Sequence, residues 1–217
     1  MNPGFRDRAT AGGRLAEMLA GYAGHENLVV LALPRGGVPV GFAVAQALGA
    51  PLDVFVVRKL GVPGFEELAM GAIASGGARV LNPSVLRRLP KAETMLAQAT
   101  AREAAELTRR ERLYREGRPA LEVRGRTVIV VDDGLATGAS MRAAVAALRQ
   151  LGAARIVAAV PVGDPGVCAQ LRSEVDEVAC AVMPAYFEAV GQFYDDFSQT
   201  TDEEVRVLLA RSRSAEG

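Results

Sequence analysis

The sequence has no tryptophan, one histidine and two cysteines. His25 stands alone, and Cys168 and Cys180 form no Cys-x-x-Cys pair, which excludes the usual kinds of zinc site. We therefore expect both cysteines to be reduced residues of the core. No run approaches the roughly 18 apolar residues of a membrane span, so no membrane association and a cytoplasmic location are expected.

Neither sign of charge is in excess, because 25 basic and 25 acidic side chains cancel and the pI is near 6.6. This balance creates no uniform field that would attract nucleic acid or an anionic membrane, and no nucleic-acid partner is expected. Lysine is also scarce, since every basic residue except Lys59 and Lys91 is arginine. Arginine suits phosphate recognition, although a compositional bias of the source genome is the simpler explanation for most of these residues.

The 217 residues, half of them hydrophobic, can bury the core of one α/β domain that spans 1–217. Strand and helix patterns alternate from about 28 to 182, and this alternation predicts a doubly wound, mostly parallel sheet with flanking helices. The predicted strands are 28–33, 52–57, 127–131, 155–160 and 176–182. The predicted helices are 7–20, 38–48, 140–151 and one that begins at a capping sequence at 201–204.

Three segments stand outside this alternation. The glycine-rich segment 60–78 predicts a long mobile loop or a loose hairpin, and hence a flexible lid. The segment 84–118 is rich in Ala, Leu, Glu and Arg, which predicts one or two helices with a solvated side and a candidate homodimer surface. The segment 183–212 holds an aromatic cluster and a final helix, and we expect it to form a small hood.

The segment with the clearest chemical signal is Val128-Ile-Val-Val-Asp-Asp-Gly-Leu-Ala-Thr-Gly-Ala-Ser140. Asp132 and Asp133 end a predicted strand, which is where open parallel sheets bind ligands. The next residues open a helix whose unpaired N–H groups suit a phosphate; they are Ala136, Thr137, Gly138, Ala139 and Ser140. Adjacent carboxylates can accept hydrogen bonds from a sugar diol or help to bind Mg²⁺, so the combination indicates a ribose phosphate.

This segment resembles the phosphoribosyl pyrophosphate signature of the type I phosphoribosyltransferases. The resemblance implies that Asp132 and Asp133 hold the ribose hydroxyls, take part in catalysis and bind Mg²⁺, directly or through water, while 136–140 hold the 5'-phosphate. Response-regulator receivers also carry paired acids at a strand end. Their acids follow the first strand, however, and they need a later lysine, whereas no lysine follows Lys91.

Two further motifs gain meaning from the resemblance. Leu33-Pro-Arg-Gly-Gly37 follows the first strand, where the family binds pyrophosphate, so Arg35, Gly36 and Gly37 are predicted to bind it through an anion nest. Arg58 and Lys59 close the next predicted strand and resemble the basic pair of adenine-type members, so they too are predicted to bind pyrophosphate. A plain structural turn and ordinary salt bridges are the respective alternatives.

The residues that are predicted to serve the acceptor resemble two different subclasses of the family. Hypoxanthine-type members carry an acid immediately before the Thr-Gly pair, where this chain has Ala136. Adenine-type members share Asp-Asp-x-x-Ala-Thr-Gly and place a glutamate in the lid, a catalytic role that Glu66 or Glu67 can fill. The hood loosely resembles the base-binding edge of the hypoxanthine type, which makes base-binding candidates of Tyr186, Phe187, Phe193 and Tyr194. An aromatic core is the alternative.

The resemblance implies a glycosyltransferase of nucleotide metabolism. It would use phosphoribosyl pyrophosphate and Mg²⁺, act on a purine-like or other nitrogenous, nucleobase-like acceptor, and release pyrophosphate. The alternative is a phosphoribosyl-pyrophosphate-sensing regulatory protein without catalytic activity, which the missing acid at Ala136 keeps open. A ligase-like or hydrolytic enzyme lacks support, because the sequence has no Gly-x-Ser-x-Gly elbow and no Walker lysine.

Overall fold

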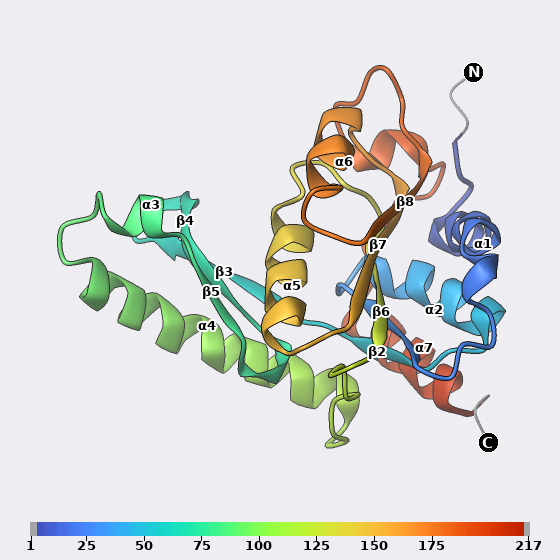
Figure 1. The fold of residues 1–217 in the computed structure, drawn as a ribbon, viewed down its shortest axis with the longest axis horizontal. Coiled ribbons are helices and arrows are strands. Elements are labelled where there is room, and N and C mark those ends of the chain that lie inside the picture. Colours follow the sequence, from blue (N-terminus) through green and yellow to red (C-terminus); the bar gives the residue numbers. More distant parts are fainter. Residues whose placement is uncertain (1–3, 215–217) are drawn as a thin grey trace.

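The structure, a computed structural model, describes residues 4–214. Within them the strands form one five-stranded parallel sheet in the order β2-β1-β6-β7-β8 and one three-stranded antiparallel sheet in the order β3-β4-β5 (Figure 1). The parallel strands are β1 Leu28–Ala32, β2 Leu52–Val54, β6 Thr127–Val131, β7 Arg155–Val162 and β8 Glu177–Val182. The predicted α/β class and the parallel sheet are confirmed.

Both faces of the parallel sheet are buried, as its continuous β-branched runs predicted. Successive side chains point to opposite faces, so Val30 and Ile129 join the core under one group of helices while Val29 and Val128 join the core under another. The first face is covered by α1 (Arg8–Met18), α2 (Gly37–Leu48) and α7 (Asp202–Ser214), and the second by α5 (Ala139–Gln150) and α6 (Pro165–Leu171). None of the helices in 4–214 combines the length and the apolar character that a membrane span requires.

The winding of the chain reverses at β1, because β2 pairs with one side of β1 and β6 with the other. In open parallel sheets the connections diverge at such a point and leave a crevice at the carboxyl ends of the strands. The loops that follow β1 and β6 both lie at this crevice. The fold thus brings together two segments that are about 100 residues apart in the sequence.

The three-stranded sheet replaces the mobile loop expected at 60–78. It consists of β3 Val57–Val62, β4 Phe65–Ala74 and β5 Arg79–Leu81, with the single turn η2 (Ser75–Gly77) between the last two. Two of its glycines serve close packing of strands, because a Cβ on Gly61 would lie 2.7 Å from the carbonyl oxygen of Glu66 and one on Gly71 would overlap that of Val80. The loose-hairpin alternative was nearer the structure than the long loop.

The predicted strand 52–57 is also corrected, since β2 ends at Val54 and β3 begins at Val57. Phe55 donates its backbone N–H to the carbonyl of Ala32, and from there the chain leaves the parallel sheet. Arg58 and Lys59 therefore lie within β3 rather than at the end of a parallel strand.

The segment 84–118 is helical, as predicted. It contains the end of α3 (Pro83–Leu86) and the long α4 (Ala92–Arg115), which runs beneath the three-stranded sheet and ends beside the parallel one (Figure 1). Single turns of 3₁₀ helix occur at η1 (Ala20–Tyr22) and η3 (Val190–Phe193).

Candidate functional site

The loops after β1 and β6 pack directly against each other at the crevice. A Cβ on Gly36 would overlap the carboxyl group of Asp133, and one on Gly37 would lie 2.7 Å from the carbonyl oxygen of Val131 and 3.0 Å from the Cα of Asp132. Only glycine permits this approach. The structure therefore brings the predicted pyrophosphate-binding turn and the predicted ribose-binding acids into one site.

The two acids have different surroundings. Asp132 accepts a hydrogen bond from the backbone N–H of Asp133 at 2.9 Å, and burial of its carboxyl, together with the charge of Asp133, raises its pKa well above the usual value. Asp133 instead accepts a 2.8 Å bond from Nε of Arg8, a residue of α1. Asp133 thus has a close cation, whereas Asp132 forms no ion pair with any described residue.

The loop from Gly134 to Gly138 is fixed by hydrogen bonds at Leu135 and is exposed to solvent at Thr137. Leu135 donates its N–H to the carbonyl of Val162 and accepts from the N–H of Asp164, both at 2.9 Å. Gly138 has φ +73° and immediately precedes α5, while Thr137 and Ser140 are exposed. A cavity of about 160 Å³ lies here, lined by Asp132, Gly134–Met141 and Val190. Its exposed N–H groups at a helix start are suited to an anion.

A groove of about 530 Å³ adjoins this loop and separates α5 from the three-stranded sheet. Lys59 is an exposed residue that lines the groove together with Thr137, Ala139 and Ser140. Most of the other lining side chains are small or apolar, such as Ala72 and Ala143. The fold therefore brings Lys59 to the predicted phosphate loop, although from within β3 and not from the end of a parallel strand as expected.

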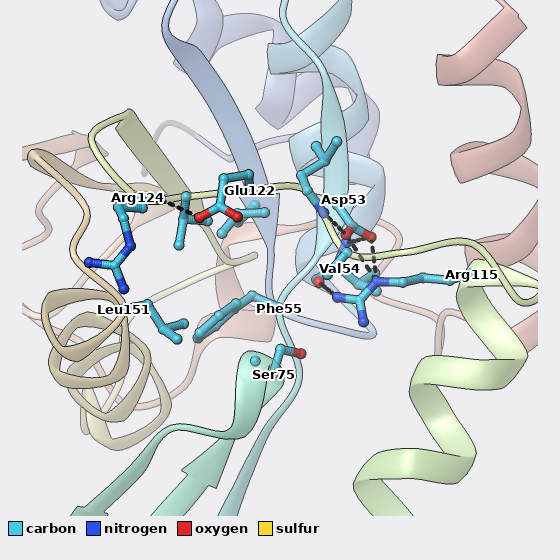
Figure 2. A pocket seen from close by; sticks show the side chains of 13 residues that line it. Asp53, Val54, Phe55, Ser75, Arg115, Glu122, Arg124 and Leu151 are labelled. Carbon is cyan, nitrogen blue, oxygen red and sulfur yellow. Dashed lines mark hydrogen bonds and ion pairs between the residues drawn. The ribbon is translucent and has the colours of Figure 1, made fainter.

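A third cavity, of about 250 Å³, lies away from these loops and is shown in Figure 2. Two of its four charged side chains form a pair, since Arg115 Nε lies 2.9 Å from the Asp53 carboxylate and each of these side chains is only 9% exposed. Asp53 also accepts from the N–H groups of Val54 and Leu121. This pair fastens the end of α4 to β2, so we assign the cavity a structural origin.

Comparison with known proteins identifies the family. The model of the phosphoribosyl transferase domain matches residues 6–197. The chain belongs to this family. The match spans both loops of the crevice and confirms the resemblance to the type I phosphoribosyltransferases.

Two curated proteins of Mycobacterium tuberculosis, from strains CDC 1551 / Oshkosh and ATCC 25618 / H37Rv, carry the provisional name of phosphoribosyl transferase. Each is 48% identical to this chain over 208 residues, which is 96% of this chain and 47% of the relative. The chain thus spans about half the length of the curated relatives it matches.

Among solved structures, TT1426 from Thermus thermophilus is 46% identical, with a TM-score of 0.86 over 97% of this chain and 99% of that one. The AQ2163 protein from Aquifex aeolicus, 12% identical, has a TM-score of 0.50 over 85% of this chain and 78% of that one, and shows likeness of fold alone.

Family members of this type are expected to use Mg²⁺, and the acids of the crevice suit it. In proteins Mg²⁺ is commonly held by one or two carboxylates, with water and substrate oxygens as the other ligands. No group of three His, Cys, Asp or Glu side chains that could hold a metal ion occurs among residues 4–214. A cation would also relieve the cost of ionising the desolvated Asp132. Asp132 and Asp133 are therefore the residues that would hold Mg²⁺.

Arg35 and Arg58, both predicted to bind pyrophosphate, have different partners. Arg35 follows β1 and lies 3.7 Å from the Asp202 carboxylate, in a pair that is about one-third exposed on both sides. Arg58 makes hydrogen bonds of 2.6 and 2.9 Å to Glu103 of α4, whose side chain is only 10% exposed. The salt-bridge alternative thus describes Arg58, which holds the three-stranded sheet on α4.

The lid glutamates lie in β4. Glu66 is exposed, and the side chain of Glu67 lies outside the described part of the structure. The hairpin of β3 and β4 projects away from the parallel sheet in Figure 1, so the structure does not bring this segment beside the acid pair.

Two aromatics of the hood belong to the core, and the base-binding prediction is corrected for these two. Phe193 is 1% exposed and Tyr194 is 7% exposed, and both pack with Phe5 in an apolar cluster. The hydroxyl of Tyr194 donates to the backbone carbonyl of Asp133 at 2.6 Å, so this ring supports the acid pair. Phe187 stacks on Phe193 at 5.7 Å, while Tyr186 is 89% exposed.

Sequence reasoning missed Arg8 entirely. The Arg-Asp-Arg sequence at 6–8 precedes a helix, and nothing in its local pattern points to a partner 125 residues away. Its side chain nevertheless reaches the acid pair and is only 11% exposed. Only the packing of α1 across the sheet reveals this contact.

Proposed function

We propose that this chain is a phosphoribosyltransferase that transfers phosphoribose from phosphoribosyl pyrophosphate to a purine-like or other nitrogenous acceptor, with Mg²⁺ as cofactor and pyrophosphate as leaving group. The observation that carries the proposal is the contact between Gly36-Gly37 and Asp132-Asp133 at the switch point of the sheet. One crevice offers an anion-binding turn, two acids and a phosphate-binding helix start. A donor with a phosphate at each end of a sugar matches this order of groups.

In the proposed reaction a ring nitrogen of the acceptor forms a bond to C1 of the ribose while the bond from C1 to pyrophosphate breaks. Positive charge develops on the sugar, and the carboxylates of Asp132 and Asp133 hold its hydroxyls and stabilise that charge. The backbone N–H group of Gly36, together with Arg35, receives the negative charge of the leaving group, whereas the N–H of Gly37 donates to the carbonyl of Leu33 at 3.1 Å. Mg²⁺, when bound, adds further neutralisation of the pyrophosphate.

The 5'-phosphate is assigned to the loop Ala136–Ser140, with Lys59 at its outer side. For the acceptor, Tyr186 is the most exposed of the four base-binding candidates, at 89%, and we assign it to stacking on a flat heterocycle. Glu66 or Glu67 would handle the acceptor proton, which requires the β3–β4 hairpin to move toward the crevice. A cytoplasmic setting fits Cys168 and Cys180, which are free and buried.

The test is a screen of nucleobases and related heterocycles for pyrophosphate release from phosphoribosyl pyrophosphate in the presence of Mg²⁺. The expected result is release that depends on one acceptor class and is lost in the Asp132→Asn, Asp133→Asn double variant. Donor binding without release from any acceptor would favour the sensing protein instead. Absence of donor binding would remove both assignments.

A further inference from the structure

We propose that Arg8 is a positioning residue of the site, which orients the Asp133 carboxylate toward the sugar and leaves Asp132 as the acid that faces a metal ion. This inference rests on the proposed function, because it assigns separate tasks to the two acids within it. It adds a residue from outside the sequence motifs that define the family resemblance.

The contacts of Arg8 account for two of its nitrogen atoms. Nε donates to Oδ2 of Asp133 at 2.8 Å, and Nη1 donates to the backbone carbonyl of Ser198 at 2.7 Å. The guanidinium carbon also lies 4.0 Å from the centre of the Phe197 ring. Arg8 therefore ties the acid pair to the C-terminal segment at 197–198.

Both partners of the ion pair are shielded from solvent, at 11% exposure for Arg8 and 17% for Asp133. Because water is largely excluded, it screens the two charges less, and the pair stays in one geometry. The same residue is held from a second side, since Tyr194 binds the backbone carbonyl of Asp133. The backbone at Gly36 lies against the pair from a third side, because a Cβ there would overlap Oδ2 of Asp133 and lie 3.3 Å from Nε of Arg8. The orientation of Asp133 is thus determined by three separate segments.

Arg8 lies in helix α1, but at a position where its charge does not stabilise the helix. It is the first residue of α1, where the positive end of the helix dipole disfavours a cation. The cap next to it is well formed, since Asp7 accepts from the N–H of Thr10 at 2.7 Å. That hydrogen bond lowers the pKa of Asp7 to about 2. The arginine therefore contributes to the crevice rather than to the helix.

The ion pair with Arg8 gives Asp132 and Asp133 different roles. A carboxylate has two oxygens, so Asp133 with Oδ2 bonded to Arg8 keeps Oδ1 to accept from a neutral hydroxyl while its charge is balanced. Asp132 has no ion pair among the residues described, so Arg8 binds Asp133 directly and acts on Asp132 only through its charge. Without Arg8, the crevice would present two unbalanced carboxylates to an anionic donor, and its binding would depend more strongly on Mg²⁺.

The experiment compares Arg8→Gln, Arg8→Lys and the control Arg14→Gln, which removes an exposed arginine from the same helix. Titration calorimetry measures the affinity for phosphoribosyl pyrophosphate at several Mg²⁺ concentrations. We expect Arg8→Gln to weaken donor binding about tenfold and to steepen its Mg²⁺ dependence. Arg8→Lys should recover part of the affinity because it restores the charge without the planar fork, and Arg14→Gln should match the unmodified protein.

The outcomes separate this proposal from the one it rests on. If the unmodified protein binds no donor, the proposed function fails and the role of Arg8 fails with it. If the protein binds donor and Arg8→Gln binds it equally well with the same Mg²⁺ dependence, only the role of Arg8 is overturned. If Arg8→Gln does not fold, Arg8→Lys alone decides, because unchanged affinity and Mg²⁺ dependence after loss of the fork would contradict orientation by a guanidinium.

Discussion

The two sheets of this molecule place arginine–carboxylate pairs in opposite settings. In the three-stranded sheet, Arg58 and Glu103 join β3 to α4. At the edge of the parallel sheet, Arg8 and Asp133 meet beside the open loop at Ala136–Ser140. The first pair connects two packed elements and has no anion-binding backbone next to it. The second lies where strand ends, glycine turns and a helix start converge, so the same kind of ion pair serves packing in one place and a ligand crevice in the other.

The test with the largest expected effect replaces Asp132 and Asp133, the two acids at the end of β6. We expect Asp132→Asn combined with Asp133→Asn to weaken donor binding by at least about 100-fold, because hydrogen bonds to charged groups contribute about 1.5–3 kcal/mol each. Titration calorimetry with and without Mg²⁺ measures the loss. Glu93→Gln, an exposed substitution on α4, is the control and should leave the affinity unchanged. Retained affinity in the double variant would place the donor elsewhere.

The next test asks whether the three-stranded sheet takes part in the chemistry at all. If its hairpin supplies the acceptor's proton-handling group, Glu66→Gln with Glu67→Gln should slow turnover by about 100-fold, the lower limit for general acid–base catalysis. Donor affinity should stay the same, because the acids and turns of the crevice are untouched. Steady-state kinetics with the acceptor found by the screen, together with calorimetry, separates the two effects. Unchanged turnover would confine the chemistry to the parallel sheet.

A stability test addresses the assignment of Arg58 to packing. Arg58→Met should reduce the free energy of unfolding by about 1–3 kcal/mol, since it leaves the mostly buried Glu103 with Arg102 as its remaining arginine. Donor affinity should change little. Chemical denaturation measures the first quantity and calorimetry the second. A large loss of donor affinity in a stable variant would restore the prediction that Arg58 binds pyrophosphate.

The same pair gives a dependence on pH. Burial raises the pKa of Glu103, but hydrogen bonds from Arg102 and Arg58 outweigh burial, and the net pKa is lowered from its ordinary value of 4.5. A lowered folded-state pKa means that the stabilisation is present above pH 4.5 and is lost as the pH falls through the folded value. Unfolding between about pH 6 and pH 3 should therefore show a smaller loss of stability in Glu103→Gln than in the unmodified protein. Equal losses would contradict this role.

The smallest expected effect concerns the support of the acid pair by the hood. Tyr194→Phe removes the hydroxyl that binds the carbonyl of Asp133, and we expect it to reduce stability by about 1 kcal/mol. Donor affinity should fall only a few-fold, since the ring still fills the same apolar cluster. Thermal unfolding and calorimetry check both values, with Tyr186→Phe on the exposed ring as the matched control for stability.

The candidate site was predictable where it is local in sequence. Strand, acids, turn and helix start follow one another within Val128–Ser140, so their order alone indicates what the segment binds. Lys59 and Arg58 show the limit, because two adjacent residues on one strand point to different surroundings. Which of them meets the phosphate loop depends on how the three-stranded sheet packs between α4 and α5.

What the sequence by itself determined is the parallel core and its crevice. Continuous β-branched runs form strands buried on both faces, and the rules for joining such strands leave few arrangements. The tertiary structure alone decided that the glycine-rich segment 60–78 is an ordered sheet, that Phe193 and Tyr194 of the hood are buried and that Arg8 reaches Asp133. The physical reason is that a glycine permits both motion and close packing, and an aromatic or an arginine suits both core and surface. Only partners brought from distant parts of the chain select between these uses.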